Sequence, residues 1–335
     1  MENSGIDSQA FREEVADVHR GYEQLKQEIG KVVIGQEQVV DLMIISMFTN
    51  SHSLLMGVPG LAKTLLVHSL AEATSLEFTR VQFTPDMMPS DLIGTEILQE
   101  DRASGQRAFK FMPGPIFTNL LLADEINRTT PKTQAALLQA MQERQVSIGG
   151  TTHLLDPPFL VFATQNPIEQ EGTYPLPEAQ LDRFLFRIDV TYPEYDQEIR
   201  MVMNTTSRDH QKIEPVYTKD RLLRHQSLVR QIPAGETVVS YAVSLVRATR
   251  PNQEGQSAFA KENVRWGAGP RASQALILAG KARALLDGRY AVEKEDIDFL
   301  AGPILVHRIM PTFQAEAEGM SSSDIIRHCL DTVRI

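Results

Sequence analysis

A glycine-bearing turn after an apolar segment carries the residues best suited to chemistry. Residues 53–56 form the apolar segment, and residues 57–64 read Gly-Val-Pro-Gly-Leu-Ala-Lys-Thr before a helical pattern begins. Backbone N–H groups and a helix N-terminus supply partial positive charge, a lysine reaches phosphate oxygens, and a threonine hydroxyl can bind Mg²⁺. The pattern predicts a nucleoside triphosphate site that includes Gly57, Val58, Pro59, Gly60, Leu61, Ala62, Lys63, Thr64 and Leu65.

Ala62 departs from the strict form of this pattern, which has glycine immediately before the lysine. We expect alanine to be tolerated only if this position has helical dihedral angles and its methyl group points away from the phosphates. Lys63 is then expected to reach the β- and γ-phosphates, and Thr64 to hold Mg²⁺. An ordinary strand-turn-helix with a surface lysine is the alternative interpretation.

A second segment ends in two adjacent carboxylates. Residues 119–123 read Asn-Leu-Leu-Leu-Ala and are apolar after the first, which is typical of a strand buried on both faces, and Asp124 and Glu125 follow directly. In an open parallel sheet, ligands bind at the carboxyl ends of the strands. Asp124 is therefore expected to hold the Mg²⁺ shell, and Glu125 to orient and deprotonate an attacking water. An exposed Asp-Glu turn is the alternative, and the upstream phosphate loop makes it less favoured.

Three further polar side chains are candidates for the same chemistry. Asn166 follows a strand predicted at 159–164, which places an amide beside the proposed triphosphate. Arg183 ends a short helix, and Arg271 lies in the first turn of a later helix. Taken alone, Asn166 belongs to an Asn-Pro turn and the two arginines are solvated surface residues.

Composition restricts the class of protein. A chain of 335 residues suits one large or two medium domains. Its net charge of −10 argues against broad binding of nucleic acid or acidic lipid, because neutralising phosphates needs a basic surface, although a ring can hide a basic channel. The single cysteine, Cys329, excludes an intrachain disulfide and a cysteine-rich zinc site. Because residues 1–16 lack a signal-peptide pattern and no apolar run could span a membrane, we expect a cytoplasmic protein.

Strands that alternate with helices predict an α/β core with a parallel sheet covered on both faces, followed by an all-helical domain. The expected boundary gives a nucleotide-binding core with N-terminal helices at 1–193 and the helical domain at 194–335. Two hairpins are expected within the core, 94–98 with 108–111 through the connector 101–105, and 146–148 with 152–154 around Gly149-Gly150. The other expected strands are 53–56, 78–83, 119–123, 159–164 and 186–190. In the core, two helices are expected to end near residues 29 and 48, a short one to lie at 85–92, and another to begin at Thr130-Pro131. The helices expected in the helical domain are 196–203, 219–230, 237–249, 270–287 and 294–306.

Together these segments resemble the AAA+ ATPases and, within them, the MoxR family of the magnesium-chelatase-like branch. The resemblance covers nearly the whole chain. Its most specific passage is residues 121–143, an acidic motif and the helix that follows, and the two hairpins resemble insertions that mark this branch. The other matching segments are an adenine-cupping segment (Val33, Ile34, Gly35 and Gln36), the phosphate loop 57–64, the sensor 1 strand 163–167, the arginine-finger motif 181–184 and the sensor 2 motif 269–271.

The resemblance implies an AAA+ P-loop core with a smaller helical lid, assembled into a ring that is usually a hexamer. ATP and Mg²⁺ would lie at the subunit interfaces. Lys63 and Thr64 would then bind the phosphates and the metal, Asp124 would organise the metal, and Glu125 would activate water.

The same resemblance assigns the remaining polar residues. Asn166 would position the water, Arg271 would couple the γ-phosphate to the helical lid, and Arg183 would act in trans on the ATP of a neighbouring subunit. Arg128 and Arg187 are the alternatives for the trans role, because sequence does not tell which arginine faces the adjacent subunit.

Family members resemble chaperones that mature or activate protein complexes, often with a partner that carries a von Willebrand factor A domain, and this is the leading interpretation. A nucleic-acid remodelling motor is the alternative, since helicase-like relatives share both hairpins. Basic residues near the first hairpin (Arg102, Arg107 and Lys110) are, however, offset by acidic ones (Glu96, Glu100 and Asp101). A nucleotide-gated scaffold is a third interpretation, which the combination of Glu125, Asn166 and Arg183 disfavours. The sequence does not identify the client protein.

Overall fold

A five-stranded parallel sheet forms the centre of the protein. The computed structural model describes residues 8–100, 107–168, 172–206, 211–251 and 258–334. The strands follow the order β2-β5-β8-β1-β9, and every neighbouring pair is parallel. This confirms the predicted α/β core. The strands are β1 (Ser53–Met56), β2 (Phe78–Gln82), β5 (Leu120–Asp124), β8 (Leu160–Gln165) and β9 (Phe186–Asp189).

Apolar runs in the sequence become the buried centre of this sheet. All five residues of β5 and the first five of β8 are buried, as expected for strands covered on both faces. Thr130 precedes the first turn of α5 and Pro131 begins it, in agreement with the predicted helix start. The core helices are α1 (Ser8–Gly30), α2 (Glu37–Phe48), α3 (Lys63–Ala73), α4 (Pro89–Ile93), the 3₁₀ helix η1 (Ile126–Arg128), α5 (Pro131–Glu143) and α6 (Glu178–Leu181).

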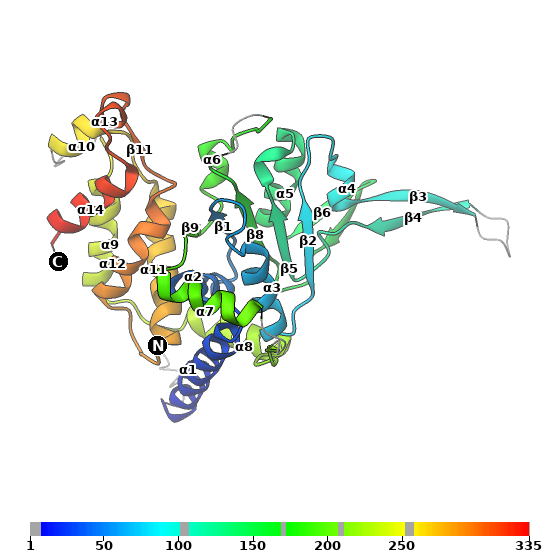
Figure 1. Ribbon diagram of the computed structural model, residues 1–335, viewed down its shortest axis with the longest axis horizontal. Coiled ribbons are helices and arrows are strands. Elements are labelled where there is room, and N and C mark those ends of the chain that lie inside the picture. The colour runs from blue at the N-terminus through cyan, green and yellow to red at the C-terminus, as the bar shows by residue number, and fades with distance from the viewer. Residues whose placement is uncertain (1–7, 101–106, 169–171, 207–210, 252–257, 335) are drawn as a thin grey trace, which may run out of the picture.

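Two antiparallel hairpins are inserted into the core, as predicted. β3 (Gly94–Glu100) pairs with β4 (Arg107–Pro113) and extends away from the body at the end opposite the C-terminal helices (Figure 1). β6 (Gln145–Ile148) pairs with β7 (Thr151–Leu154), and Gly149 and Gly150 between them have φ of 57° and 83°, which glycine adopts readily. The predicted connector 101–105 lies outside the described residues.

Helices dominate the C-terminal part of the chain, and the predicted helical lid is confirmed. Five of its helices were predicted from their apolar periodicity, with ends that differ by a few residues. The structure adds two short helices and an antiparallel pair, β10 (Val264–Trp266) with β11 (Met310–Pro311), that the sequence pattern is too short to reveal. It also adds a helix of 11 residues near the C-terminus that was not predicted. The helices are α7 (Tyr195–Thr205), α8 (Lys219–Val229), α9 (Glu236–Ala248), α10 (Ala258–Asn263), α11 (Pro270–Leu286), α12 (Lys294–Leu305), α13 (Phe313–Ala317) and α14 (Ser322–Thr332).

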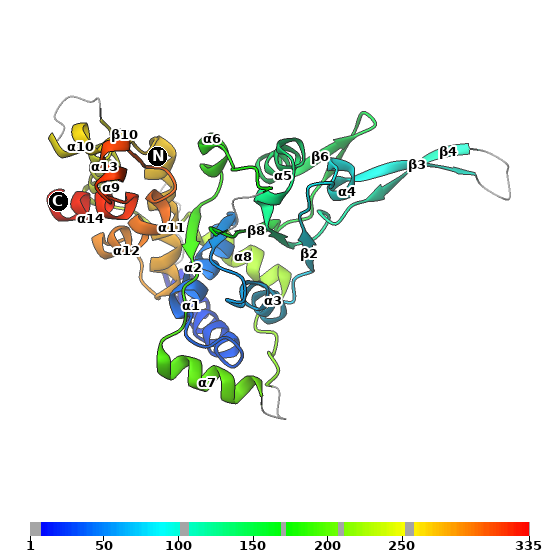
Figure 2. The same ribbon diagram turned by 45° about the horizontal axis from the view of Figure 1, so that its top comes forward.

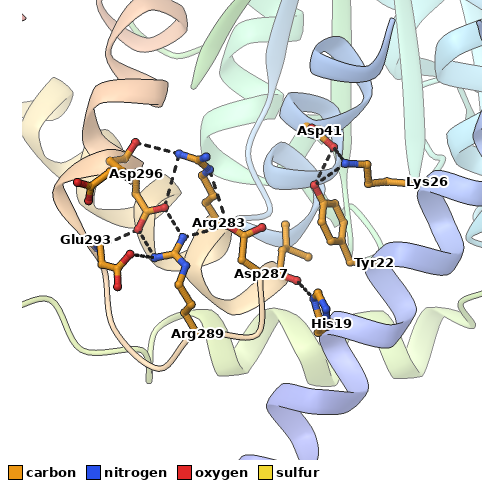
Figure 3. Close-up of polar contacts among 11 residues, drawn as sticks. His19, Tyr22, Lys26, Asp41, Arg283, Asp287, Arg289, Glu293 and Asp296 are labelled. Atoms are coloured by element: carbon orange, nitrogen blue, oxygen red, sulfur yellow. Dashed lines mark hydrogen bonds and ion pairs between the residues drawn. The ribbon is translucent and has the colours of Figure 1, made fainter. Parts of the chain in front are cut away.

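The N-terminal helices join the core to the lid. Tyr22 and Lys26 of α1 both contact Asp41 of α2, at 2.7 and 2.9 Å, and His19 lies 2.7 Å from the carbonyl oxygen of Leu286 at the end of α11 (Figure 3). One hydrophobic cluster accordingly includes side chains of α1, α2, the sheet, α11 and α12, whereas a second cluster fills the other face of the sheet below α5. The domain boundary near residue 193 stays a prediction.

Charged side chains also hold the lid together. Asp296 of α12 is fully buried, and Arg289 binds both of its carboxylate oxygens, at 2.5 and 2.8 Å (Figure 3). Arg283 and Glu293 complete this network. Figure 2 shows α7 at the lower margin of the molecule, below α1 and α3 in that view. In the part of the chain that the structure describes, no helix has the length and apolar character that a membrane span requires.

Candidate functional site at the carboxyl edge of the sheet

Three predicted site segments follow neighbouring strands. The phosphate loop follows β1, the acidic pair ends β5, and Asn166 follows β8. β8 lies between β5 and β1, with Ala163 paired to Ala123 and Gln165 paired to Met56. Because the three strands are parallel, the structure brings these segments together at one carboxyl edge.

The phosphate loop contains two left-handed positions. Gly60 has φ of 87°, and Ala62, which precedes α3, has φ of 55° and ψ of 25°. The expectation of helical dihedral angles at Ala62 is therefore wrong. The left-handed conformation lets the chain turn into α3, and glycine is the usual residue there because an L side chain crowds its own backbone. When left-handed and right-handed residues alternate along a loop, successive backbone N–H groups point into the concave side of the loop, where they can bind an anion.

Lys63 is the first residue of α3 and bends back over the loop. Its Nζ donates to the carbonyl oxygens of Gly57 and, at 3.3 Å, Val58. Burial lowers the pKa of Lys63, and the negative charges of Asp124 and Glu125 oppose that shift. The lysine is therefore within electrostatic reach of both carboxylates, so the loop and the acidic pair form one site.

Asp124 is held from two sides. One carboxylate oxygen accepts from Nη2 and Nε of Arg80, at 2.7 and 3.1 Å, and the other accepts from Oγ1 of Thr164 at 2.6 Å. The carboxylate and the Thr64 hydroxyl are oxygen ligands of the kind that Mg²⁺ binds beside phosphates. The residues therefore fit a magnesium ion shared with a nucleotide, and Arg80 is a neighbouring positive charge that such an ion must compete with.

Glu125 occupies a strained position. Its φ of 57° and ψ of 52° are left-handed, and its N–H donates to Oγ1 of Thr164 at 2.8 Å. Its carboxylate accepts from Gln82 at 2.8 Å and from Arg128 at 3.1 Å. These contacts aim the side chain out of the strand end and hold it beside β2.

Asn166 is 6% exposed, and its side-chain oxygen accepts from the N–H of Ile168 at 3.1 Å. This contact is that of an Asn-Pro turn, the alternative interpretation of this segment. The residue nevertheless lies at the predicted edge, directly after β8, with its position fixed by the turn.

A cavity of about 470 Å³ adjoins this edge, within the range of small-molecule sites. It lies between Gly35, the end of β9 and the lid residues Gly302, Pro303 and Val306. Gln36 anchors one wall by donating to the carbonyl oxygen of Thr191 at 2.8 Å.

Two members of the predicted adenine-cupping segment lie apart from this cavity. Val33 and Ile34 line a smaller cavity of about 110 Å³, together with Lys26 and Arg200. The structure therefore joins Gly35 and Gln36, but not Val33 and Ile34, to the larger cavity.

Arg183 and Arg271 lie at the opposite edge of the sheet. Arg183 precedes β9, and with Arg271, Arg144 and His52 it lines a cavity of about 330 Å³. Nη1 of Arg271 is 3.4 Å from Asp182. The structure thus brings the two arginines together, but at the amino ends of β1 and β9 and not beside Lys63 of the same chain.

The three arginines considered for a trans role differ in their contacts. Arg128 binds Glu125 and so belongs to the carboxyl edge. Arg187 pairs with Asp189 at 3.0 Å and lines the 470 Å³ cavity. Within the described residues, the Arg183 guanidinium has no hydrogen bond or ion pair, although it is half-buried.

Several residues at both edges were not recognised from sequence. At the carboxyl edge they are Arg80, Gln82 and Thr164; at the amino edge they are Asp182 and Arg308. Arg80 and Gln82 are two residues apart in a strand, so they share one face next to β5, and that alternation was the available signal. Nothing local indicates that Arg308 reaches Asp182.

Comparison with known proteins adds to this geometry. Residues 52–186 match the model of the ATPase family associated with various cellular activities (AAA), and residues 256–329 match the AAA lid domain. Chaperone MoxR1 of Mycobacterium tuberculosis is 43% identical over 309 residues, which cover 92% of this chain and 80% of that protein. Protein MoxR of Methylorubrum extorquens is 32% identical over 326 residues, covering 92% and 93%. The chain belongs to the MoxR family of AAA ATPases.

A solved structure agrees with the fold of this MoxR-family ATPase. The crystal structure of a proposed ATPase from Cytophaga hutchinsonii has a TM-score of 0.90 and 41% identity, and the match covers 99% of each chain. The matched AAA segment contains Lys63, Asp124, Glu125, Asn166 and Arg183. The protein is therefore an ATPase, and ATP binding follows from its family.

Proposed function

We propose that this MoxR-family protein hydrolyses Mg²⁺-ATP at the carboxyl edge of its sheet. The observation that carries the proposal is that the phosphate loop after β1 and the Asp124-Glu125 pair ending β5 lie at the same carboxyl edge, with β8 between the two strands. The lowering of the Lys63 pKa by burial, which both carboxylates oppose, agrees with this placement. The N–H groups of the loop and Lys63 bind phosphate oxygens, while Thr64 and Asp124 hold the metal. Bound Mg²⁺ neutralises phosphate charge and polarises the bond that breaks.

Glu125 accepts the proton of the attacking water in this proposal, and Asn166 orients that water. Gln82 and Arg128 hold the Glu125 carboxylate on the β2 side, so these two contacts must break before the carboxylate can turn toward the water. The 470 Å³ cavity, which includes Gly35, would hold the base and ribose.

We further propose that the subunits form a ring, hexameric as in the family that the sequence resembles. A head-to-tail interface joins two different surfaces, so one edge of a subunit meets the other edge of its neighbour. Arg183 supports this assembly because it lies at the amino edge without a described partner, whereas Arg128 and Arg187 have contacts at the carboxyl edge. Arg271 shares the amino edge, so both Arg183 and Arg271 would serve the ATP of the neighbour.

A protein is the proposed client. The M. tuberculosis relative is named a chaperone, and the first hairpin exposes the apolar side chains of Ile97, Leu98, Phe109 and Met112. A partner with a von Willebrand factor A domain is proposed from the family resemblance alone. A nucleic-acid motor is less well supported, because described charges on the hairpin are of both signs, including an Arg107 to Glu100 ion pair at 3.1 Å.

Mixed rings test the trans assignment. Lys63→Ala should abolish ATP binding, and Arg183→Ala should leave binding intact but lower turnover by about 10³-fold or more if it acts as an arginine finger. A random equal mixture should recover about one quarter of wild-type turnover, because about one interface in four joins an intact Lys63 to an intact Arg183. No recovery after confirmed subunit exchange would refute the trans role and favour Arg128 or Arg187.

A further inference from the structure

Arg308 makes an unusually complete set of contacts with the segment around Arg183. It follows α12, is 8% exposed, and uses all five N–H donors of its guanidinium. Nε donates to the carboxylate of Asp182 at 2.7 Å. The four remaining donors bind backbone carbonyl oxygens, those of Asp182 (3.2 Å), Phe184 (2.7 Å), Leu185 (3.2 Å) and Ile304.

These contacts enclose Arg183 without touching its side chain. Arg308 binds the backbone immediately before and immediately after Arg183, and Nε2 of His307 lies 3.2 Å from the same Phe184 carbonyl oxygen. The second carboxylate oxygen of Asp182 faces Arg271 at 3.4 Å. One lid residue therefore fixes the backbone that carries Arg183 and orients the carboxylate beside Arg271.

The same end of the lid also lines the nucleotide cavity. Gly302, Pro303 and Val306 contribute to the wall of the 470 Å³ cavity, and Val306 is only two residues before Arg308. The last turn of α12 therefore lies beside the 470 Å³ cavity and leads directly to Arg308.

We propose that Arg308 is a positioning residue that sets Arg183 and Arg271 for the ATP of a neighbouring subunit. The proposal rests on the trans role of Arg183 described above. Arg308 is not among the residues that line the 470 Å³ cavity, so its substitution should leave ATP affinity within about twofold of wild type. A displacement of about 1 Å at a reacting group can cost about 100-fold in rate, so turnover of Arg308→Gln rings should fall about 10- to 100-fold.

Mixed rings of two inactive variants test whether Arg308 acts on the site of a neighbouring subunit or on its own. When Arg308→Gln is mixed with Lys63→Ala, the intact site of the first can meet the intact arginines of the second, and about one quarter of wild-type turnover should return. Mixed with Arg183→Ala, Arg308→Gln should give no recovery, because every interface then lacks a positioned arginine. The reverse pattern would mean that Arg308 serves its own site, and would overturn the proposal.

Two further variants address folding. Arg308→Lys keeps the charge beside Asp182 but offers three donors from one point in place of the planar set of five, so it should show the same pattern with a smaller loss. Arg289→Gln is the matched control, since Arg289 is also a lid arginine bound to carboxylates, yet none of its described contacts reaches residues 182–185. If Arg289→Gln also lost turnover, and recovered it with Lys63→Ala but not with Arg183→Ala, the effect would come from lid stability and the proposal would be overturned.

Ring assembly is checked by light scattering. Folding of the arginine variants is checked by their ATP affinity, and folding of Lys63→Ala by its thermal unfolding. The pair Lys63→Ala with Arg183→Ala is run alongside. If that pair fails to recover, the trans role itself is refuted and no trans arginine remains to be positioned. If that pair recovers and Arg308→Gln recovers with neither partner, or turns over at the wild-type rate alone, the proposal for Arg308 is wrong while the trans role stands.

Discussion

The left-handed alanine in the phosphate loop gives a prediction with a defined sign. Ala62 has φ of 55° and ψ of 25°, where an L residue costs about 1–2 kcal/mol relative to the right-handed region. Ala62→Gly removes that cost but makes the unfolded chain more flexible, which offsets about 0.4–1 kcal/mol. The net expectation is a gain in stability of about 0.8 kcal/mol, the difference between the middles of these two ranges. Ala62→Val places a β-branched residue there and should lose about 1 kcal/mol or more.

An ordinary helical alanine should respond with the opposite sign. Ala135 is exposed in the first half of α5, so Ala135→Gly should cost about 1 kcal/mol. Thermal unfolding should resolve the difference, since about 1 kcal/mol corresponds to about 2–4 °C for domains of 150–250 residues. The glycine substitutions should thus shift the melting temperature in opposite directions.

ATP affinity gives an independent measure at the same position. If the Ala62→Val substitution raises the cost of the left-handed loop by about 1 kcal/mol, the fraction of binding-competent loops falls about fivefold, and the apparent Kd rises by the same factor. Titration with a fluorescent ATP analogue measures this change. Wild-type affinity in Ala62→Val, or a loss of stability in Ala62→Gly as large as that in Ala135→Gly, would refute the assignment of strain to this residue.

Three other predictions follow from charges on and inside the protein. Arg80→Gln should lower the Mg²⁺ concentration for half-maximal ATP binding about two- to fivefold, the effect of losing a partly exposed ion pair with Asp124. An unchanged midpoint would show that Arg80 does not compete with the metal. Burial lowers the pKa of His52 to about 4, whereas in the unfolded chain this histidine takes up its proton near pH 6.5. Its contribution to the free energy of unfolding should therefore be complete above pH 6.5 and fall by about 3 kcal/mol as the pH drops to 4. Urea unfolding of wild type and His52→Gln checks this, and an equal dependence of the free energy of unfolding on pH in the two proteins would contradict it. ATP turnover should not respond to single- or double-stranded nucleic acid at low salt, and several-fold stimulation with salt-sensitive binding would favour a nucleic-acid motor.

Sequence was sufficient where the determining residues are close together along the chain. The phosphate loop follows its strand directly, and Asp124 and Glu125 terminate an apolar run, so strand polarity alone brings Lys63 and the carboxylates to one edge. The conformation of Ala62 was not accessible in this way. Its dihedral angles depend on how the loop closes onto α3, and the residue type favours a different region from the one adopted.

The amino edge shows why the remaining site residues could not be predicted. Arg271 meets Asp182 across 89 residues and Arg308 meets it across 126, so both contacts depend on how the lid docks on the sheet. Helical periodicity gives the buried face of α11 and α12 but carries no information about which edge of the sheet their ends reach. Apolar packing of α1 and α2 against both parts fixes that docking. The placement of Arg271 next to Arg183, rather than next to Lys63, is therefore a property of tertiary packing that its own motif does not encode.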